Sequence, residues 1–454
     1  MNHKKHLLTI FLAVFINITG FAIILPLSPA MLEFYLPSEE ATSGVMGEII
    51  SSIKTVIASL GKEKPAFTTA VFFGCFLASL YAFLQFIFAP ICGRISDRYG
   101  RRPVMLFTLT GAMISYGLWA VAASFNLFII SRILAGVMAA NLSVVTAAMA
   151  DVTSKEDRTK GMMLVGIAFG LGFLFGPAMG GLLTQINLLS LYPSLGAFGI
   201  NPFSACALVA MMLSAINLLW IYMKFDETLP VEKRLNPQKS HKFMEAFRAQ
   251  SSSILRTNFS YFIFILSFSG LEFTLAFIAA ERFSYGPKQI GYLFLYIGFI
   301  LIFARGYIVR KFSTKVEERM LAIAGVVSGI ISFSTIAFAF TQSVFILGSS
   351  FLAIAIALTS TSLSSLVSLY STERTQGRDL GLFNSAGSLA RAFGPLLASI
   401  PYIYLGAQGA YISISSLLFI PLFLIFFLPK PDKTSTKRVE PLAEALEETE
   451  TPTV

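Results

Sequence analysis

Twelve long apolar runs, separated by short polar or charged segments, follow one another along the chain. Each has about 20 residues or more, which is the length that an α-helix needs to cross a bilayer. The pattern predicts spanning helices at residues 7–29, 67–92, 104–123, 127–150, 161–184, 202–223, 258–280, 289–309, 320–340, 344–369, 379–402 and 406–428. Strands of a membrane barrel would instead alternate over about ten residues. We therefore expect an all-α membrane protein.

The composition agrees with a bilayer environment. Of 454 residues, 55% are apolar and 13% are charged, whereas an average soluble domain has about 25% charged residues. A water-soluble globule is therefore excluded. The three cysteines lack metal-ligand spacing, and no Gly-x-x-x-x-Gly-Lys-Ser/Thr loop is present. We expect no metal, no cofactor, no enzymatic chemistry and no ATP-driven transport.

The distribution of Lys and Arg along the chain indicates its membrane topology. The net charge of +9 is scattered over short loops, while a nucleic-acid surface would need a basic patch or stripe. With twelve spans both termini share a side, and 26 of the 34 Lys and Arg residues lie on that side, against five opposite and three within spans. The positive-inside rule then predicts cytoplasmic termini. The count does not distinguish the plasma membrane from an internal one.

A polar segment divides the spans into two sets of six. We predict an N-terminal six-helix bundle at residues 1–223, a cytoplasmic linker at 224–257, a C-terminal six-helix bundle at 258–428 and a cytoplasmic tail at 429–454. Short sequences repeat between the halves at a displacement of 215 to 218 positions, for example Ile87-Phe88-Ala89 and Ile302-Phe303-Ala304. Such repeats predict two pseudo-symmetric bundles.

The loop after the second span carries four arginines and one aspartate in eleven residues, from Gly93 to Pro103. It resembles the signature loop of the major facilitator superfamily, whose aspartate and arginines join a charge network that latches the two halves in one conformation. The resemblance assigns that role to six residues: Gly93, Asp97, Arg98, Arg101, Arg102 and Asp151. A loop that serves only topology is the alternative.

The fifth span holds glycines at four-residue intervals beside a proline: Gly172, Gly176, Pro177, Gly180 and Gly181. Small residues on one helix face let a neighbouring helix approach closely. The pattern resembles the antiporter signature of the drug:proton exchangers within the superfamily. Generic helix packing is the alternative.

Few charges lie within the spans, because an ionised group at the bilayer centre costs about 3 kcal/mol or more. Glu272 is the only carboxylate well inside a span, so it is our candidate for reversible protonation. Arg391 and Arg132 are the candidate cations, and Arg132 followed by Gly136 resembles the superfamily motif of the fourth span. The alternatives are a structural ion pair for Glu272 and snorkelling to the interface for Arg132.

Several segments are similar to the eukaryotic tetracycline-transporter-like proteins of the drug:proton antiporter group. They include residues 100–106, 227–230, 269–275, 389–391 and 394–395. The resemblance implies export or exchange of organic anions and tetracycline-like compounds. One position departs from it: such antiporters carry an aspartate nine residues before the proline of span 1, where this chain has Asn17. Proton coupling would then depend more on Glu272.

We therefore expect a monomeric major facilitator transporter that exchanges small organic solutes by alternating access, with protons as the coupled ion. By family analogy, spans 1, 4, 7 and 10 line the binding site and contribute polar side chains, among them Asn17, Asn141 and Ser269. An uncoupled organic-anion uniporter is one alternative, which Asn17 favours. A receptor or scaffold that has lost transport is another, although an intact charged loop argues against it.

Overall fold

The computed structural model describes residues 3–37, 44–59, 65–153, 158–230, 234, 250–309, 311, 316–372 and 375–430. Every regular element in these ranges is helical. The first half holds α1 (His3–Ala22), the 3₁₀ turn η1 (Leu25–Leu27), α2 (Ser28–Tyr35), α3 (Gly44–Ser59), α4 (Pro65–Tyr99), α5 (Arg101–Ala120), α6 (Phe125–Met138), α7 (Asn141–Val152), α8 (Arg158–Leu183), α9 (Leu188–Leu191), the 3₁₀ helix η3 (Pro193–Phe198) and α10 (Ser204–Lys224). The second half holds α13 (Ser252–Phe283), α14 (Pro287–Phe303), the π-helix η4 (Ala304–Val309), α16 (Glu318–Ala337), α17 (Gln342–Tyr370), α18 (Gln376–Leu417) and α19 (Phe419–Phe426).

Eleven helical segments of the described chain are long and apolar enough to cross a membrane. The last of them, Gln376–Phe426, has 51 residues, far more than the roughly 20 that one crossing needs. It bends at Gly406, whose φ of 73° is not helical, and this bend separates the predicted eleventh and twelfth spans. The predicted twelve-helix, all-α fold is confirmed.

Two predicted boundaries were wrong. The segment after span 2 was expected to be a loop, but α4 continues through it to Tyr99, and only Gly100 interrupts the helix before α5 begins. The first span breaks after Ala22, because Pro26 lacks the N–H that would continue the helix, and a 3₁₀ turn leads into α2.

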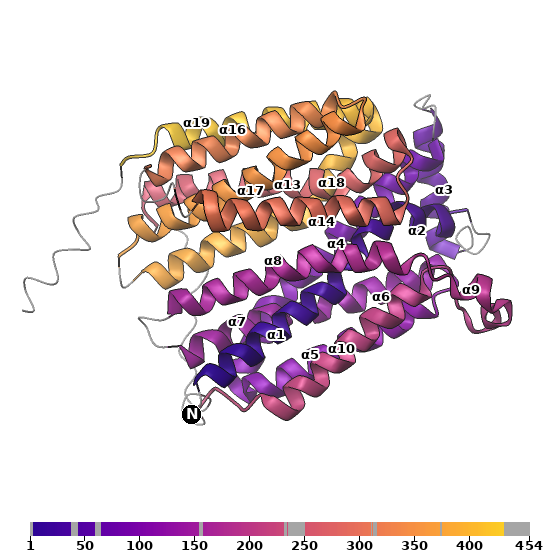
Figure 1. Cartoon of the computed structure of the whole chain (residues 1–454), viewed down its shortest axis with the longest axis horizontal. Coiled ribbons are helices and arrows are strands. Elements are labelled where there is room, and N and C mark those ends of the chain that lie inside the picture. Colours follow the sequence, from indigo (N-terminus) through magenta and orange to yellow (C-terminus); the bar gives the residue numbers. More distant parts are fainter. Residues whose placement is uncertain are drawn as a thin grey trace, which may run out of the picture.

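The two halves lie side by side, each as a bundle of helices running along the same axis (Figure 1). We use "basic end" for the end of the molecule at which α4 is followed by α5. The helices α7 and α10 also end there. The "far end" is the opposite one, where α3 and α9 lie (Figure 1). The predicted division at residues 224–257 stays a prediction, since most of that linker, like the tail beyond residue 430, lies outside the described residues.

The apolar core differs between the two ends. One large cluster runs through both halves and includes Leu32, Cys75 and Phe277. A second cluster, with Ile10 and Val144 among its members, belongs to the first half alone. The halves therefore share one core, and the first half has a second core of its own.

Candidate functional site

At the far end the two halves pack tightly against each other. Ser79 Oγ on α4 accepts a hydrogen bond of 3.0 Å from the Leu396 N–H on α18. The rings of Phe67 and Phe277 meet edge to face with their centroids 6.2 Å apart. Gly74 lies so near that a Cβ atom there would come within 2.6 Å of the Phe277 ring. These contacts join the halves along the part of α4 from its middle to the far end, where a hollow of about 700 Å³ remains between α2, α3, the start of α4 and the end of α13.

At the basic end the same helices have free space around them. A Cβ atom would meet no atom within 4 Å at five glycines on the basic parts of α4, α8 and α18: Gly93, Gly166, Gly170, Gly377 and Gly381. Among the described residues, the cited contacts between the halves therefore lie from the middle of the helices to the far end, whereas these glycines at the basic end have free space beside them.

Glu272 lies on α13 and Arg391 on α18. Their charges interact, yet no salt bridge or hydrogen bond of either side chain is found in the described part of the chain. The Arg391 side chain is exposed and Glu272 is partly exposed. Arg391 lies two residues from Phe393, which contacts Phe83 of α4 across the interface between the halves. The pair therefore lies where the halves begin to separate.

Arg132 is held in a different way. Its side chain is 6% exposed, and its guanidinium carbon lies 5.0 Å from the ring centre of Trp119 and 5.4 Å from that of Phe128. Nε donates to Ser131 Oγ at 3.3 Å, and buried Nη2 has no hydrogen-bond partner. Aromatic faces stabilise a cation in this way. Snorkelling, which needs an exposed guanidinium, does not occur here.

The remaining polar candidates differ in their surroundings. Asn141 begins α7 and is buried, and its Oδ1 atom has no hydrogen-bond partner. Asn17 is half-buried on α1. Ser269 is buried against Gly394 of α18, so it lies in the contact between two helices of the second half.

The glycines of α8 permit two close contacts. A Cβ at Gly172 would lie 2.7 Å from Ile18 Cβ, and one at Gly176 would lie 2.6 Å from Ala22 Cβ. Both contacts, like that of Gly180 with the Ile23 carbonyl, are with the first span. Gly181 points elsewhere: its Cβ would lie 2.6 Å from the Pro287 carbonyl oxygen of the second half. The motif therefore packs α8 against α1 and, at one position, against α14.

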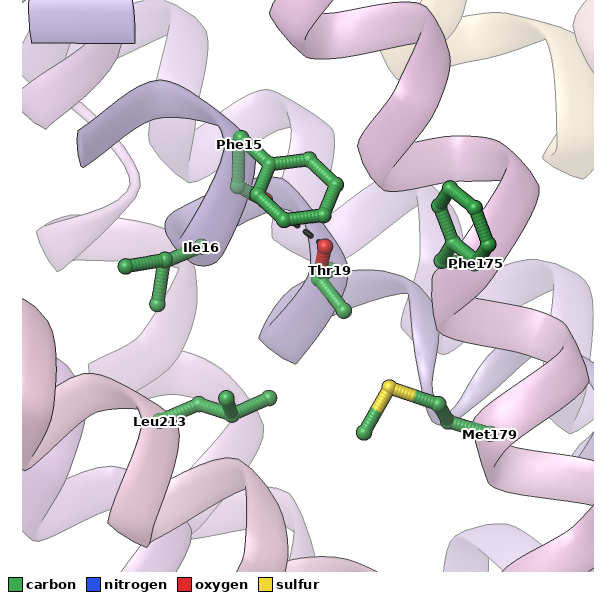
Figure 2. A pocket seen from close by; sticks show the side chains of 6 residues that line it. All are labelled: Phe15, Ile16, Thr19, Phe175, Met179 and Leu213. Carbon is green, nitrogen blue, oxygen red and sulfur yellow. Dashed lines mark hydrogen bonds between the residues drawn. The ribbon is translucent and has the colours of Figure 1, made fainter. Parts of the chain in front are cut away.

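Beside this contact is a small apolar pocket of about 230 Å³ between α1, α8 and α10 (Figure 2). Its lining is Phe15, Ile16, Thr19, Phe175, Met179 and Leu213. The Thr19 hydroxyl donates to the Phe15 carbonyl at 2.7 Å, so it is engaged by its own helix. The pocket lacks the polar groups that would orient a charged substrate.

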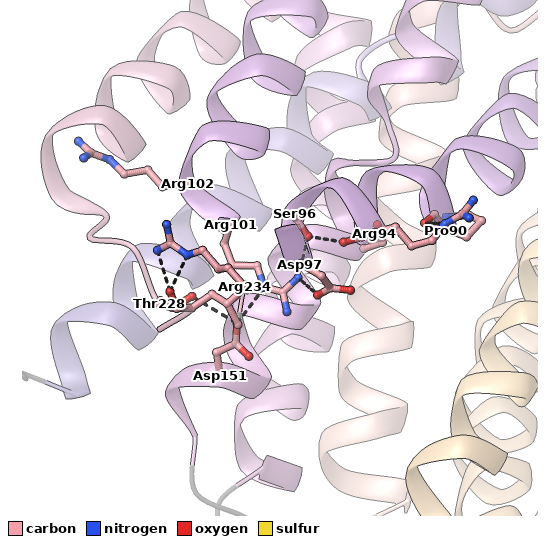
Figure 3. Close-up of polar contacts among 12 residues, drawn as sticks. Pro90, Arg94, Ser96, Asp97, Arg101, Arg102, Asp151, Thr228 and Arg234 are labelled. Carbon is pink, nitrogen blue, oxygen red and sulfur yellow. Dashed lines mark hydrogen bonds and ion pairs between the residues drawn. The ribbon is translucent and has the colours of Figure 1, made fainter. Parts of the chain in front are cut away.

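The charged network at the basic end is centred on Arg101 (Figure 3). Its Nη1 lies 2.7 Å from Asp97 Oδ1 and donates to Ser96 Oγ at 2.6 Å, while Nε donates to Asp151 Oδ2 at 2.8 Å. Arg98 lies over the ring of its neighbour Tyr99. In the described part of the chain, these contacts all stay within the first half. In this conformation the network therefore joins α4, α5 and α7, not the two halves.

Arg102 and Gly93, the other two residues assigned to the network, lie outside its centre. Arg102 Nη2 donates to the Tyr222 carbonyl at 2.6 Å. Gly93 lies within α4 with open space beside it, so it does not form the tight turn that a loop would need.

One acid of the network was missed from the sequence. Glu227, just beyond α10, accepts hydrogen bonds from the backbone N–H groups of Arg101 (2.8 Å) and Arg102 (3.0 Å). It thereby caps α5, whose first turn contains no acid of its own. Its neighbour Thr228 donates to Asp151 Oδ2 at 3.4 Å. Residues 227–230 were noticed only as a family-like segment, since nothing local shows what they touch.

Comparison with known proteins decides the family. The family model described as the Major Facilitator Superfamily matches residues 10–395 and, in a second match, residues 311–451. The chain belongs to the major facilitator superfamily. It is therefore a multi-pass membrane transporter and not an enzyme.

Within the superfamily, the chain is 31% identical to human major facilitator superfamily domain-containing protein 10, over 95% of this chain and 94% of that one. It is also 31% identical to the class C tetracycline resistance protein of Escherichia coli, over 58% of this chain and 63% of that one. A crystal structure of the human organic anion transporter MFSD10 (TETRAN) superposes with a TM-score of 0.73 at 30% identity, covering 94% of this chain and 100% of that one. The predicted relation to drug-efflux members is confirmed.

Proposed function

We propose that this transporter carries small organic anions in coupling with protons by alternating access, with Arg391 as the anion contact and Glu272 as the proton carrier. The observation that carries the proposal is the exposed Arg391 within α18, for which the described part of the chain provides no salt bridge, together with partly exposed Glu272, whose charge interacts with it. An unpaired cation at bilayer depth is costly, so an anion that pairs with it gains free energy. The similarity to an organic anion transporter and to tetracycline resistance proteins supports the same substrate class.

Arg132 is the weaker anion contact of the two. It is buried against Trp119 and Phe128, and their ring faces already stabilise its charge. An anion would have to displace this packing before it could bind there. We therefore assign Arg132 to the support of the site rather than to direct substrate contact.

The free space beside glycines at the basic end supports an orientation. If the basic end is cytoplasmic, as the positive-inside rule predicts, this conformation receives substrate from the cytoplasm, and a second conformation opens at the far end. The charge network around Arg101 then holds the first half rigid while the halves rock.

Transport in proteoliposomes tests the proposal. Purified protein is reconstituted, and uptake of a fluorescent organic anion is measured with and without an imposed pH gradient. We expect uptake to follow the gradient, to fall at least tenfold in Arg391→Gln, and to persist in Lys288→Gln, which removes the same charge at the far end. A cationic preferred substrate, or full activity of Arg391→Gln, would overturn the anion assignment.

Asn17 favours a second candidate function for the same site, an uncoupled uniporter. It cannot ionise, so span 1 supplies no proton carrier, and an uncoupled uniporter would show the same loss in Arg391→Gln. Uptake that ignores the pH gradient in the wild type would establish the uniporter.

A further inference from the structure

The connection between α8 and α10 forms a structured extension of the first half. It holds α9 and η3 and projects beyond the other helices at the far end (Figure 1). Asn187 Oδ1 caps α9 by accepting from the N–H groups of Leu189 (3.1 Å) and Ser190 (3.2 Å). Gly199 ends η3 with a φ of 80°. The extension therefore has a defined shape of its own.

The base of the extension is fixed to the turn between α5 and α6. Asn201 Nδ2 donates to the Ala122 carbonyl at 3.1 Å, and the Asn201 side chain is buried. Gly199 lies directly against the Val121 carbonyl, where a Cβ atom would not fit. The extension therefore keeps a constant position on the first half.

The surface of the extension is unusually apolar for a connection at the end of a bundle. Leu191 is 61% exposed, Tyr192 60% and Phe198 73%. No charged residue or histidine occurs between Lys160 and Lys224. The other long segment at the far end, α3, carries Glu48 and Lys54. Apolar surface left in water costs about 25 cal/mol per Å², so something other than water should cover the extension.

The structure favours the lipid bilayer as the environment of this apolar surface. Leu182 and Ile186, at and just after the end of α8, are also exposed and continue the lipid-facing surface of that spanning helix into the extension. Tyrosine is enriched at the headgroup level of membranes, and the apolar side chains of segments that lie in the interface enter the headgroup–acyl boundary. We propose that residues 184–203 form an interfacial anchor, with Leu191, Tyr192 and Phe198 inserted at the headgroup–acyl boundary on the far side of the membrane.

The anchor has a consequence for movement. Because the contacts that hold it, among the described residues, are with the first half, it sets the depth of that half in the bilayer. The second half then rocks against a first half whose far end is held at the membrane surface.

Site-directed spin labelling tests the anchor. Phe198→Cys and, separately, Leu191→Cys are labelled with a nitroxide and reconstituted in liposomes, and the label's accessibility to oxygen and to a water-soluble nickel chelate is compared. Glu48→Cys on exposed α3 is the matched control. The native cysteines Cys75, Cys92 and Cys206 are all buried, and the unsubstituted protein measures their background labelling.

We expect both extension labels to collide several times more often with oxygen than with the nickel chelate, and the Glu48 label to show the reverse. Extension labels that are as accessible to the chelate as the control would overturn the proposal and would leave the patch for a partner protein absent from the liposomes. Labels shielded from both reagents would also overturn it, since they would indicate contact with a second copy of the chain.

Discussion

Glu227 Oε1 accepts a hydrogen bond of 2.8 Å from the backbone N–H of Arg101, 126 positions earlier in the chain. One carboxylate thus ties the segment after the sixth span to the start of the third. A helix N-terminus carries unpaired N–H groups and a partial positive charge, and an acid placed there satisfies both. The close approach is possible because Gly100 has no side chain and a φ of 107°.

The cap makes a measurable contribution to stability. We expect Glu227→Ala to lower the free energy of unfolding by about 1 kcal/mol, the usual cost of a lost helix cap, with Glu227→Gln intermediate because its amide oxygen still accepts. Thermal unfolding in detergent measures the effect. Glu48→Ala, on the exposed face of α3, is the control and should leave the midpoint unchanged. Equal midpoints for Glu227→Ala and the control would contradict the cap.

The pair formed by Arg101 and Asp151 should be strongly coupled. Arg101 is 7% and Asp151 19% exposed, and removal of one partner leaves the other charge poorly solvated. Breaking a buried pair costs about 3–5 kcal/mol, so Arg101→Gln should approach the lower part of that range, since Asp151 is not fully buried. Arg98→Gln, which lies on the surface over Tyr99, is the control and should cost little.

A double-mutant cycle isolates the Arg101–Asp151 coupling. Arg101→Gln, Asp151→Asn and the double variant are compared by unfolding in detergent, and contacting residues typically show coupling of about 0.5–3 kcal/mol. Strictly additive losses would mean that the 2.8 Å contact contributes nothing to stability.

The α8–α1 contact should not tolerate a larger side chain. Gly176→Leu places a branched side chain where even a Cβ would lie 2.7 Å from the Thr19 carbonyl oxygen. We expect a loss of about 1–3 kcal/mol, as for other overpacked sites, together with reduced transport. Gly166→Leu, on the same helix but with nothing within 4 Å, is the matched control and should keep its stability. If both variants unfold alike, close packing is not what position 176 requires.

The sequence predicted the fold well because spans are local features. The length and continuous apolarity of each run suffice to predict a crossing helix. The long helix α18 contains two predicted spans, and it bends at Gly406, where span 12 was predicted to begin. Side-chain partners are not local. The partner of Glu227 is more than a hundred positions away. Ser269 was predicted to line the binding site by family analogy, and its contact with Gly394 depends on where α18 packs, which the sequence of α13 does not show. The continuation of α4 past Gly93 was missed because its charges suggested a loop.

The charge balance of Glu272 and Arg391 predicts how pH affects anion binding. When Glu272 is ionised it partly balances Arg391, and when it is protonated the arginine has no negative neighbour and should bind an anion more tightly. Protonation and anion binding then favour each other equally, because coupling between two binding events is reciprocal. Affinity for the anion should rise as pH falls through the range in which Glu272 titrates, by about 5- to 150-fold between the two limits, the usual size of such coupling.

Anion binding measured across pH in the wild type and in Glu272→Gln tests this. The variant resembles the protonated form, so it should bind well at every pH, whereas Lys288→Gln should behave like the wild type. A Glu272→Gln variant that keeps the wild-type pH dependence would show that another group carries the proton.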